Sequence, residues 1–244
     1  MERIVIVTGA AGMYGGAIAS AFGEAGNQVI ACDIKMPLLA KVVAQINKGP
    51  GQAFPYEADV RCLDQVETVV EETLRRWKRI DVIASVAGGD LLRVSKATER
   101  KLIIDSSDDD WDVVVDTNLK GAFHCIKAVA APMIKQKEGH IILMGSGTGA
   151  AGGMREAAYA AAKAGLCGLM KSAALELGKY NVKVNVVCPG RALHSGETLD
   201  KKALKERTLK RLSDVSSVAS FFVHLSRAPN VSGQIINWDS RIIF

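Results

Sequence analysis

Short apolar segments alternate with longer amphipathic segments along the chain. The apolar segments have the length of β-strands and comprise Ile4–Val7, Val29–Cys32, Ala53–Tyr56, Ile80–Ser85, His140–Met144, Val182–Cys188 and Gln234–Trp238. The amphipathic segments have helical periodicity and comprise Gly15–Ala25, Met36–Asn47, Asp64–Trp77, Asp109–Lys135, Ala157–Lys179 and Leu199–Leu225. Several strands are apolar on both faces, as expected when helices cover both sides of a parallel sheet. The alternation predicts an α/β fold with a doubly wound parallel sheet.

The length and composition are consistent with one globular unit. The chain has 244 residues, which is enough to bury an apolar core without a disulfide or a structural metal. No linker, low-complexity tract or break in composition divides the sequence. We therefore expect residues 1–244 to form a single domain.

The sequence argues against several classes of protein. No apolar run approaches the ~18 residues of a membrane span, and the start of the chain enters the first predicted strand without a secretion-signal pattern. The charges that give the net +5 alternate in sign along predicted helices, so we expect no nucleic-acid partner. The histidines lack ligand spacing, so we expect no metal site. The cysteines are odd in number and dispersed, which indicates reduced thiols and a cytoplasmic location (Cys32, Cys62, Cys125, Cys167, Cys188).

A glycine-rich turn joins the first predicted strand to the first predicted helix. Glycine lets the backbone approach a pyrophosphate, and the helix N-terminus offers free N–H groups to it. The strand before the turn and the helix after it are the context that this motif requires. We therefore expect a Rossmann-type fold in which the turn binds a dinucleotide through Gly9, Ala11, Gly12, Met13, Tyr14 and Gly15.

Asp33 ends the second predicted strand. An acidic side chain there can accept hydrogen bonds from both ribose hydroxyls of the adenosine, and it would repel a 2′-phosphate. The alternative is a carboxylate that caps the next helix. No arginine adjoins Asp33 to bind a 2′-phosphate, and Lys35 is the nearest cation. The sequence therefore favours NAD(H) over NADP(H).

Tyr159 and Lys163 lie four residues apart in a predicted helix, on the same face. The neighbouring ammonium is expected to lower the pKa of the phenol, so that Tyr159 can take a proton from an alcohol or supply one to a carbonyl. Ser146 follows the predicted strand His140–Met144 and can hold the substrate oxygen near the phenol. On its own, a Tyr/Lys pair of this spacing is usually a surface contact.

The combination of these motifs, in this order, resembles the short-chain dehydrogenase/reductase family over essentially the full chain. Further matches to the family are the adenine-side pair Asp59-Val60, the motif end Ala87-Gly88, the helix asparagine Asn118, the nicotinamide-side segment with Asn185, Pro189 and Gly190, and the turn Ser232-Gly233-Gln234. One such motif would be unspecific, but several in the right order are specific.

The resemblance implies a role for each catalytic position. Tyr159 would be the general acid/base, Lys163 would lower its pKa and bind the nicotinamide ribose, and Ser146 would orient the substrate oxygen. Asn118 would help hold a water in a proton relay that reaches Lys163. The implied cofactor-binding set is Gly9, Ala11, Gly12, Met13, Tyr14, Gly15, Asp33, Asp59, Val60, Ala87, Gly88, Tyr159, Lys163, Pro189, Gly190 and Ala192. The expected activity is hydride transfer between NAD(H) and a secondary alcohol or ketone, in a homo-oligomer (a dimer or a tetramer).

The chain also departs from the family pattern. Met13 stands at the usual middle glycine of the turn, Ser85 and Val86 replace two asparagines, and His194 stands where a threonine is frequent. These departures leave two alternatives, a non-catalytic NAD(H)-binding module and an isomerase or dehydratase that uses NAD transiently. The intact catalytic set favours the oxidoreductase. Arg191 either meets an anionic substrate group or is a surface charge.

Overall fold

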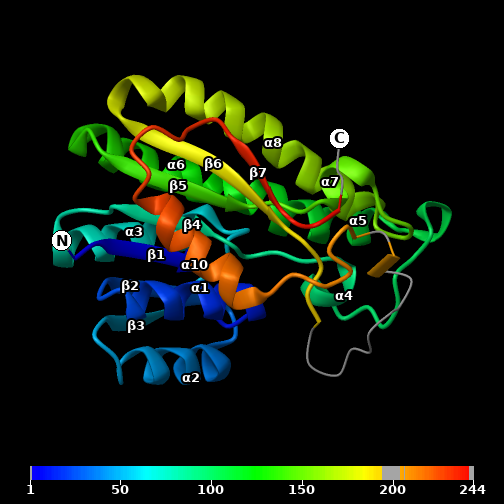
Figure 1. Ribbon diagram of the computed structural model, residues 1–244, viewed down its shortest axis with the longest axis horizontal. Helices are drawn as coiled ribbons and strands as arrows, with labels where there is room; N and C mark the ends of the chain where they lie inside the picture. The colour runs from blue at the N-terminus through cyan, green and yellow to red at the C-terminus, as the bar shows by residue number, and fades with distance from the viewer. Residues whose placement is uncertain (1, 194–203, 206, 242–244) are drawn as a thin grey trace.

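A parallel β-sheet forms the centre of the computed structural model, which describes residues 2–193, 204–205 and 207–241 (Figure 1). Its strands are β1 (Ile4–Thr8), β2 (Gln28–Asp33), β3 (Gln52–Glu57), β4 (Val82–Ser85), β5 (Gly139–Met144), β6 (Val182–Pro189) and β7 (Ile235–Trp238). In the described residues the lateral order is β3-β2-β1-β4-β5-β6-β7, and every pair is parallel. The doubly wound fold predicted from the sequence is therefore confirmed.

Helices cover both faces of the sheet. They are α1 (Met13–Glu24), α2 (Met36–Ile46), α3 (Leu63–Trp77), α5 (Asp108–Val115), α6 (Gly121–Gln136), α8 (Ala157–Leu177) and α10 (Val215–Ser226). Strand β1 shows why two layers form: Ile4 and Ile6 pack with α3, α6 and α8, whereas Val5 and Val7 pack with α1, α2 and α10. Successive side chains of a strand point to opposite faces, so a strand that is apolar throughout needs cover on both sides.

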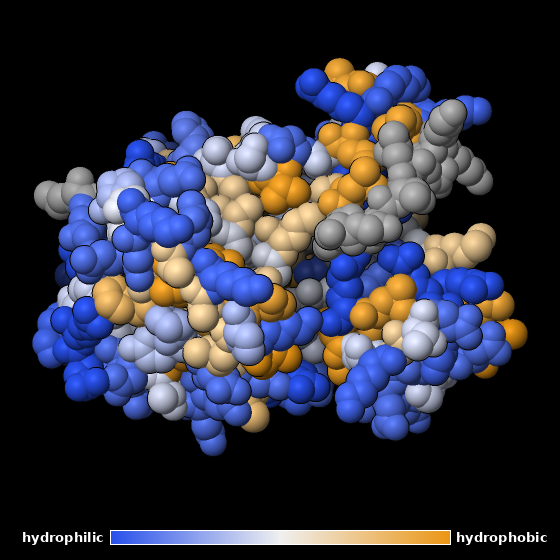
Figure 2. Space-filling view, turned by 90° about the horizontal axis from the view of Figure 1, so that it is seen from below, coloured by the Kyte–Doolittle hydropathy of each residue, from blue (hydrophilic) through white to orange (hydrophobic). Residues whose placement is uncertain are grey.

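The chain crosses from β3, at one edge of the sheet, back to β4 beside β1. In open α/β sheets ligands bind at the carboxyl ends of the strands, where the strand order reverses. The strands end toward the right of Figure 1, and Figure 2 shows the surface hollowed at that same end, with hydrophobic and hydrophilic side chains on its borders. The topology thus brings the glycine turn and the segments after β4, β5 and β6 to the same end of the sheet.

The predicted helix Asp109–Lys135 is interrupted. Helices α5 and α6 are joined by a π-helical turn, η2 (Asp116–Lys120), which contains Asn118. Such π-turns inside helices are frequent at functional sites. Short elements that the pattern did not predict lie in the polar loops, namely α4 (Leu91–Val94), η1 (Ile103–Asp105), α7 (Thr148–Ala151) and η3 (Gly178–Tyr180).

The predicted helix Leu199–Leu225 is wrong over residues 207–214, which are not helical. Helix α10 begins only at Val215, because the Asp214 side chain accepts hydrogen bonds from the N–H groups of Ser216 (3.2 Å) and Ser217 (2.9 Å). Aspartate in this role starts a helix and is less favourable inside one. The first part of the predicted helix, residues 199–203, lies outside the described residues.

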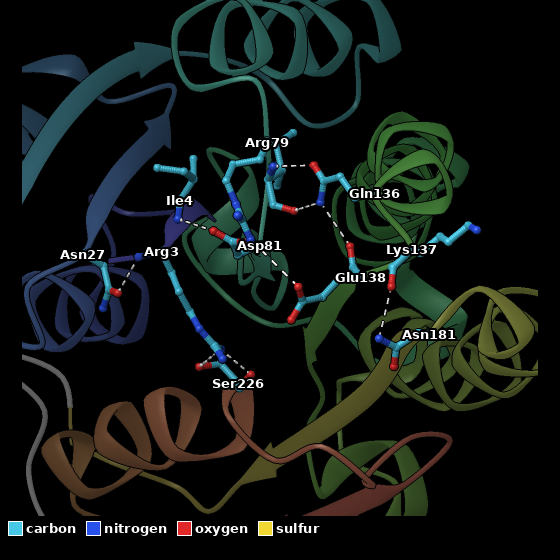
Figure 3. Close-up of polar contacts among 11 residues, drawn as sticks. Arg3, Ile4, Asn27, Arg79, Asp81, Gln136, Lys137, Glu138, Asn181 and Ser226 are labelled. Atoms are coloured by element: carbon cyan, nitrogen blue, oxygen red, sulfur yellow. Dashed lines mark hydrogen bonds and ion pairs between the residues drawn. The ribbon is translucent and has the colours of Figure 1, made fainter. Parts of the chain in front are cut away.

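A polar network fixes the amino ends of the central strands (Figure 3). The Asp81 carboxylate accepts a hydrogen bond from the Ile4 N–H at 2.8 Å and pairs with Arg79. Gln136 bonds both backbone groups of Ile80, each at 2.8 Å. These contacts lie at the end of the sheet opposite the hollow, so they hold the scaffold rigid without entering the site. In the described part of the chain, no helix is long and apolar enough to cross a membrane.

Candidate active site

The glycine turn connects β1 to α1 at the carboxyl end of the sheet. Gly9 has a φ of 68°, and a Cβ at this position would lie 2.7 Å from the Ala87 Cα atom, so only glycine fits. Helix α1 begins at Met13 after Gly12, with no side-chain cap and no acidic residue in its first turn. Its N–H groups and dipole therefore remain available to an anion, which fits the pyrophosphate of a dinucleotide.

Asp33 lies beside this turn. One carboxylate oxygen accepts a hydrogen bond from the Ala11 N–H (3.0 Å), and the other accepts one from the Lys35 N–H (2.9 Å). The side chain therefore holds the turn and bonds the backbone before α2, but it makes no capping hydrogen bond to the first turn of α2. A carboxylate has further lone pairs, and these can accept bonds from ribose hydroxyls.

The end of β4 is tied to β1 by Thr8. Its hydroxyl oxygen accepts hydrogen bonds from the N–H groups of Val86 (3.1 Å) and Ala87 (3.2 Å). The replacement of two asparagines by Ser85 and Val86 therefore leaves the central strands connected. A Cβ on Gly88 would lie 2.3 Å from Asn118 Oδ1 and 3.6 Å from Lys163 Nζ, so this backbone lies against two predicted catalytic residues.

Asn118 is 1% exposed and holds the loop after β4. Its side-chain amide donates to the carbonyls of Gly89 and Val114, each at 2.8 Å, and its Oδ1 atom accepts from the Gly89 N–H at 3.0 Å. Both amide hydrogens are therefore used by the backbone. Asn118 fixes the position of the Gly88–Gly89 segment relative to the π-helical turn.

Ser146, Tyr159 and Lys163 come together between β5 and α8. Ser146 follows β5, and its hydroxyl accepts a hydrogen bond from the Thr148 N–H at 3.2 Å. The Lys163 ammonium donates to the Met144 carbonyl at 2.8 Å and lies 5.6 Å from the centre of the Tyr159 ring. Lys163 is only 4% exposed, so its charge is held inside the protein. The juxtaposition predicted from the sequence is present.

The protonation of this group differs from the prediction. Burial raises the pKa of Tyr159 to about 12, and the hydrogen bond between the Ser146 and Tyr159 side chains only partly opposes the rise. Burial also lowers the pKa of Lys163 to about 8. The net shift of the pKa of the phenol is therefore upward rather than downward as expected, because the loss of solvent around Tyr159 is its largest cause.

Two further predicted positions lie toward the edge of the sheet that carries β3. Arg61 bonds the Asp59 carboxylate and holds its pKa below the usual range. Val60 is buried, and its carbonyl lies 2.8 Å from His124 Nδ1. Both follow the end of β3, next to the strand that carries Asp33.

Asn185 does not face the hollow, contrary to the match made from the sequence. It is fully buried inside β6, where its amide bonds the Val231 carbonyl at 2.8 Å and its Oδ1 atom accepts from the Gln234 N–H at 3.0 Å. Its nitrogen also lies 2.8 Å from His140 Nε2. Asn185 therefore ties β6 to the turn before β7.

The segment after β6 is held against the C-terminal part of the chain. The Gly190 N–H donates to the Trp238 carbonyl at 3.0 Å, and a Cβ on Gly190 would lie 2.5 Å from Asp239 Oδ1. The Gly190 carbonyl accepts a hydrogen bond from the Tyr14 hydroxyl at 3.0 Å. Pro189 ends β6, Ala192 is buried and Arg191 is exposed, whereas His194 lies outside the described residues.

A cluster of charges beside Tyr159 was not identified from the sequence. Asp90 is 7% exposed and pairs with Arg100, whose guanidinium also lies 3.2 Å from Glu156. The charges of Glu156 and Asp90 both raise the pKa of Tyr159. Asp90, Glu156 and Tyr159 share the lining of a pocket of about 160 Å³. The only sequence signal was the polarity of the long segment between Gly88 and Trp111.

A second cluster, Asp239 with Arg207 and Arg241, lies behind Gly190. Asp239 and Arg207 have side chains that are 1% and 2% exposed. Nothing in the sequence indicated the two partners of Asp239. Among the described residues, no group of three or more His, Cys, Asp or Glu side chains is placed to hold a metal ion.

Known proteins with similar sequences include two reductases of the same name. The 3-oxoacyl-(acyl-carrier-protein) reductase FabG of Thermotoga maritima is 34% identical over 248 residues, covering 99% of this chain and 98% of the relative. The enzyme of the same name from Staphylococcus epidermidis is 32% identical, covering 97% of each chain.

Solved structures with the same fold include NAD⁺-bound xylitol dehydrogenase, with a TM-score of 0.88, 25% identity and 98% of both chains covered. A protein of Sinorhizobium meliloti described as a short-chain alcohol dehydrogenase has a TM-score of 0.89 and 27% identity, covering 98% of this chain and 96% of that one. The family model for short chain dehydrogenases matches residues 3–195. The chain belongs to the short-chain dehydrogenase/reductase family of oxidoreductases.

Proposed function

We propose that this chain is an NAD(H)-dependent oxidoreductase that interconverts a secondary alcohol and a ketone. The observation that carries the proposal is the convergence of Ser146, Tyr159 and Lys163 at the same end of the sheet as the uncapped glycine turn. Binding without chemistry, or transient use of NAD by an isomerase or dehydratase, is less well supported because the complete Ser/Tyr/Lys set is present and its members lie next to one another.

The cofactor site would be formed by three consecutive parts of the hollow at the carboxyl end of the sheet, here called the crevice. Asp33 would accept hydrogen bonds from the adenosine ribose, between the glycine turn and the Asp59-Val60 pair. The turn and the N-terminus of α1 would bind the pyrophosphate. Ala87, Gly88, Pro189, Gly190 and Ala192 would border the nicotinamide half, together with Tyr159 and Lys163. A bound nicotinamide would supply the hydride acceptor or donor.

Tyr159 would exchange the proton with the substrate oxygen. Its pKa of about 12 keeps the phenol protonated at neutral pH, and this is the form that donates a proton to a carbonyl during reduction. Ser146, which hydrogen-bonds Tyr159, would hold the same oxygen. In the oxidation direction the phenolate is needed, and a protonated Lys163 nearby favours it.

The preference for NAD(H) rests on Asp33. Its carboxylate stands beside the turn, and a negative charge there repels the 2′-phosphate of NADP(H). The likeness to NAD⁺-bound xylitol dehydrogenase supports the same choice.

The remaining features of the proposal concern assembly and location. We propose a homo-oligomer, a dimer or a tetramer, that packs through α6 and α8. Large apolar side chains stand on these helices in contact with solvent, with Phe123 45% and Leu175 84% exposed. Residues 1–244 would act as one dinucleotide-binding and catalytic domain. A cytoplasmic location would agree with the cysteines, which are all free thiols.

The test is the change in absorbance of NADH with a panel of secondary alcohols and ketones, run in parallel with NADPH. Tyr159→Phe removes the hydroxyl and should lower kcat by at least a hundredfold while NADH still binds. Tyr180→Phe is the matched control, because Tyr180 lies in η3, outside the crevice. Full turnover by the Tyr159→Phe variant would overturn the proposal.

A further inference from the structure

Tyr14 connects two parts of the crevice that the sheet keeps apart. It is the second residue of α1, in the glycine turn, and its hydroxyl donates to the Gly190 carbonyl at 3.0 Å. In the sheet, β4 and β5 lie between β1 and β6. With neighbouring strands about 4.8 Å apart, the ends of β1 and β6 are roughly 14 Å from each other. One side chain therefore bridges the turn and the segment after β6.

The acceptor of this bond is firmly held. Gly190 donates its own N–H to Trp238, and it packs so closely on Ser213 and Asp239 that a Cβ would lie 2.3 Å and 2.5 Å from their oxygens. Asp239 is in turn paired with Arg207 and Arg241. The Gly190 carbonyl cannot shift without disturbing this buried cluster, so Tyr14 binds to a fixed point.

Tyr14 also faces the catalytic group from the other side of the sheet. Helix α1 packs with α10 on one face, whereas α8, which carries Tyr159, packs on the opposite face. Burial raises the pKa of Tyr14, and the charges of Asp239 and Tyr159 raise it further, so the hydroxyl stays a hydrogen-bond donor. The two phenols thus come from helices on opposite faces of the sheet.

We propose that Tyr14 is a positioning residue that ties the glycine turn to the Gly190 carbonyl and so preorganises the nicotinamide half of the cofactor site. The inference rests on the proposed function, because it assumes a dinucleotide in the crevice. The ring and the hydroxyl of Tyr14 would have separate roles. The ring packs beside the turn, and the hydroxyl sets the spacing between the turn and the Gly190 carbonyl.

The experiment compares Tyr14→Phe with the unchanged protein in binding two probes, NADH and ADP, by fluorescence and calorimetry. ADP carries the adenosine and pyrophosphate but no nicotinamide. Loss of one hydrogen bond should raise the Kd for NADH about three- to tenfold and leave the Kd for ADP within twofold. The variant keeps the ring, so the turn itself stays packed. Tyr180→Phe is the control and should change neither Kd.

Each outcome separates this inference from the proposed function. Equal weakening of NADH and ADP binding would mean that Tyr14 only supports the fold of the turn, and unchanged binding of both would mean that its hydroxyl has no role; either result overturns the inference. If the unchanged protein binds neither NADH nor NADPH, the proposed function itself fails. The melting temperature of the ligand-free variant reports any general loss of structure.

Discussion

Gly9→Ala should damage both the fold and the cofactor site. Gly9 has a φ of 68°, a conformation that costs a side chain about 1–2 kcal/mol, partly offset because alanine restricts the unfolded chain. The new Cβ would also lie 2.7 Å from Ala87 Cα and 2.8 Å from Ala87 N, which are backbone atoms that cannot rotate away. Relief of that overlap costs about 1–3 kcal/mol more. The free energy of unfolding should therefore fall by about 3 kcal/mol in total.

Gly26→Ala is a matched control for the conformational part. Gly26 has a similar φ of 77°, but no atom of the described residues lies within 4 Å of an added Cβ. It should therefore cost only about 1 kcal/mol. In a chain of this size each kcal/mol corresponds to about 2–4 °C in Tm. We expect Tm to fall by about 6–12 °C for Gly9→Ala and by about 2–4 °C for Gly26→Ala.

Thermal unfolding followed by circular dichroism measures both shifts, and a titration with NADH measures binding. The Gly9→Ala variant should bind NADH at least tenfold more weakly, because the turn must move away from the end of β4, whereas Gly26→Ala should bind it normally. Equal losses of Tm in the two variants would refute the close approach of Gly9 to Ala87. Normal NADH binding by Gly9→Ala would refute the assignment of the turn to the pyrophosphate.

Three further predictions concern charged groups. The pKa of Lys163 is about 8 in the folded protein against an ordinary 10.5, so the unfolded chain binds this proton more tightly. The cost of burying the ammonium is therefore full below about pH 8 and fades as the pH rises to about 10.5. Over that window the Tm of the unchanged protein should rise relative to the Tm of Lys163→Met. A flat difference would contradict the buried ammonium. Asp33→Ser should shift the ratio of kcat/KM toward NADP(H) at least tenfold, and an unchanged ratio in steady-state kinetics would remove Asp33 from cofactor selection. Asp81→Ala leaves the buried Ile4 N–H without its acceptor, and it should lower the free energy of unfolding by about 1–3 kcal/mol in chemical denaturation while NADH binding stays normal. Glu138→Gln changes an exposed side chain 3.9 Å from Arg79 and should alter the stability little. Equal losses of stability in the two variants would contradict the role of Asp81.

The features that could be predicted from the sequence are those with a local signal. Strands that are apolar on both faces indicate a covered parallel sheet, and the turn from Gly9 to Gly15 has a strand before it and a helix after it. The spacing of Tyr159 and Lys163 places them on one helix face. Each of these follows from residues that are close together in the chain.

The features that were missed depend on distant contacts. Asp90 meets Arg100 and Glu156 only after the chain folds, and no spacing marks that cluster. The pKa of Tyr159 is set by its burial, which a helix pattern does not give. The same holds for Asn185, whose partners come from β5 and from the turn before β7.

The wrong prediction of a helix before α10 has a different cause. Charged and apolar residues from Leu199 to Leu225 follow a helical period, and the pattern gave no sign of an interruption. The Asp214 cap and the bond from the Ser213 N–H to the Arg191 carbonyl redirect the chain instead. Side-chain capping and a long-range backbone bond therefore override the periodicity over residues 207–214.

The most direct test of the central claim is a crystal structure of the chain with NAD⁺ bound. We expect the pyrophosphate at the N-terminus of α1, the adenosine ribose against Asp33, and the nicotinamide ring within contact of Tyr159 and Lys163. A dinucleotide bound elsewhere, or a nicotinamide kept away from Tyr159 by the surrounding side chains, would contradict it.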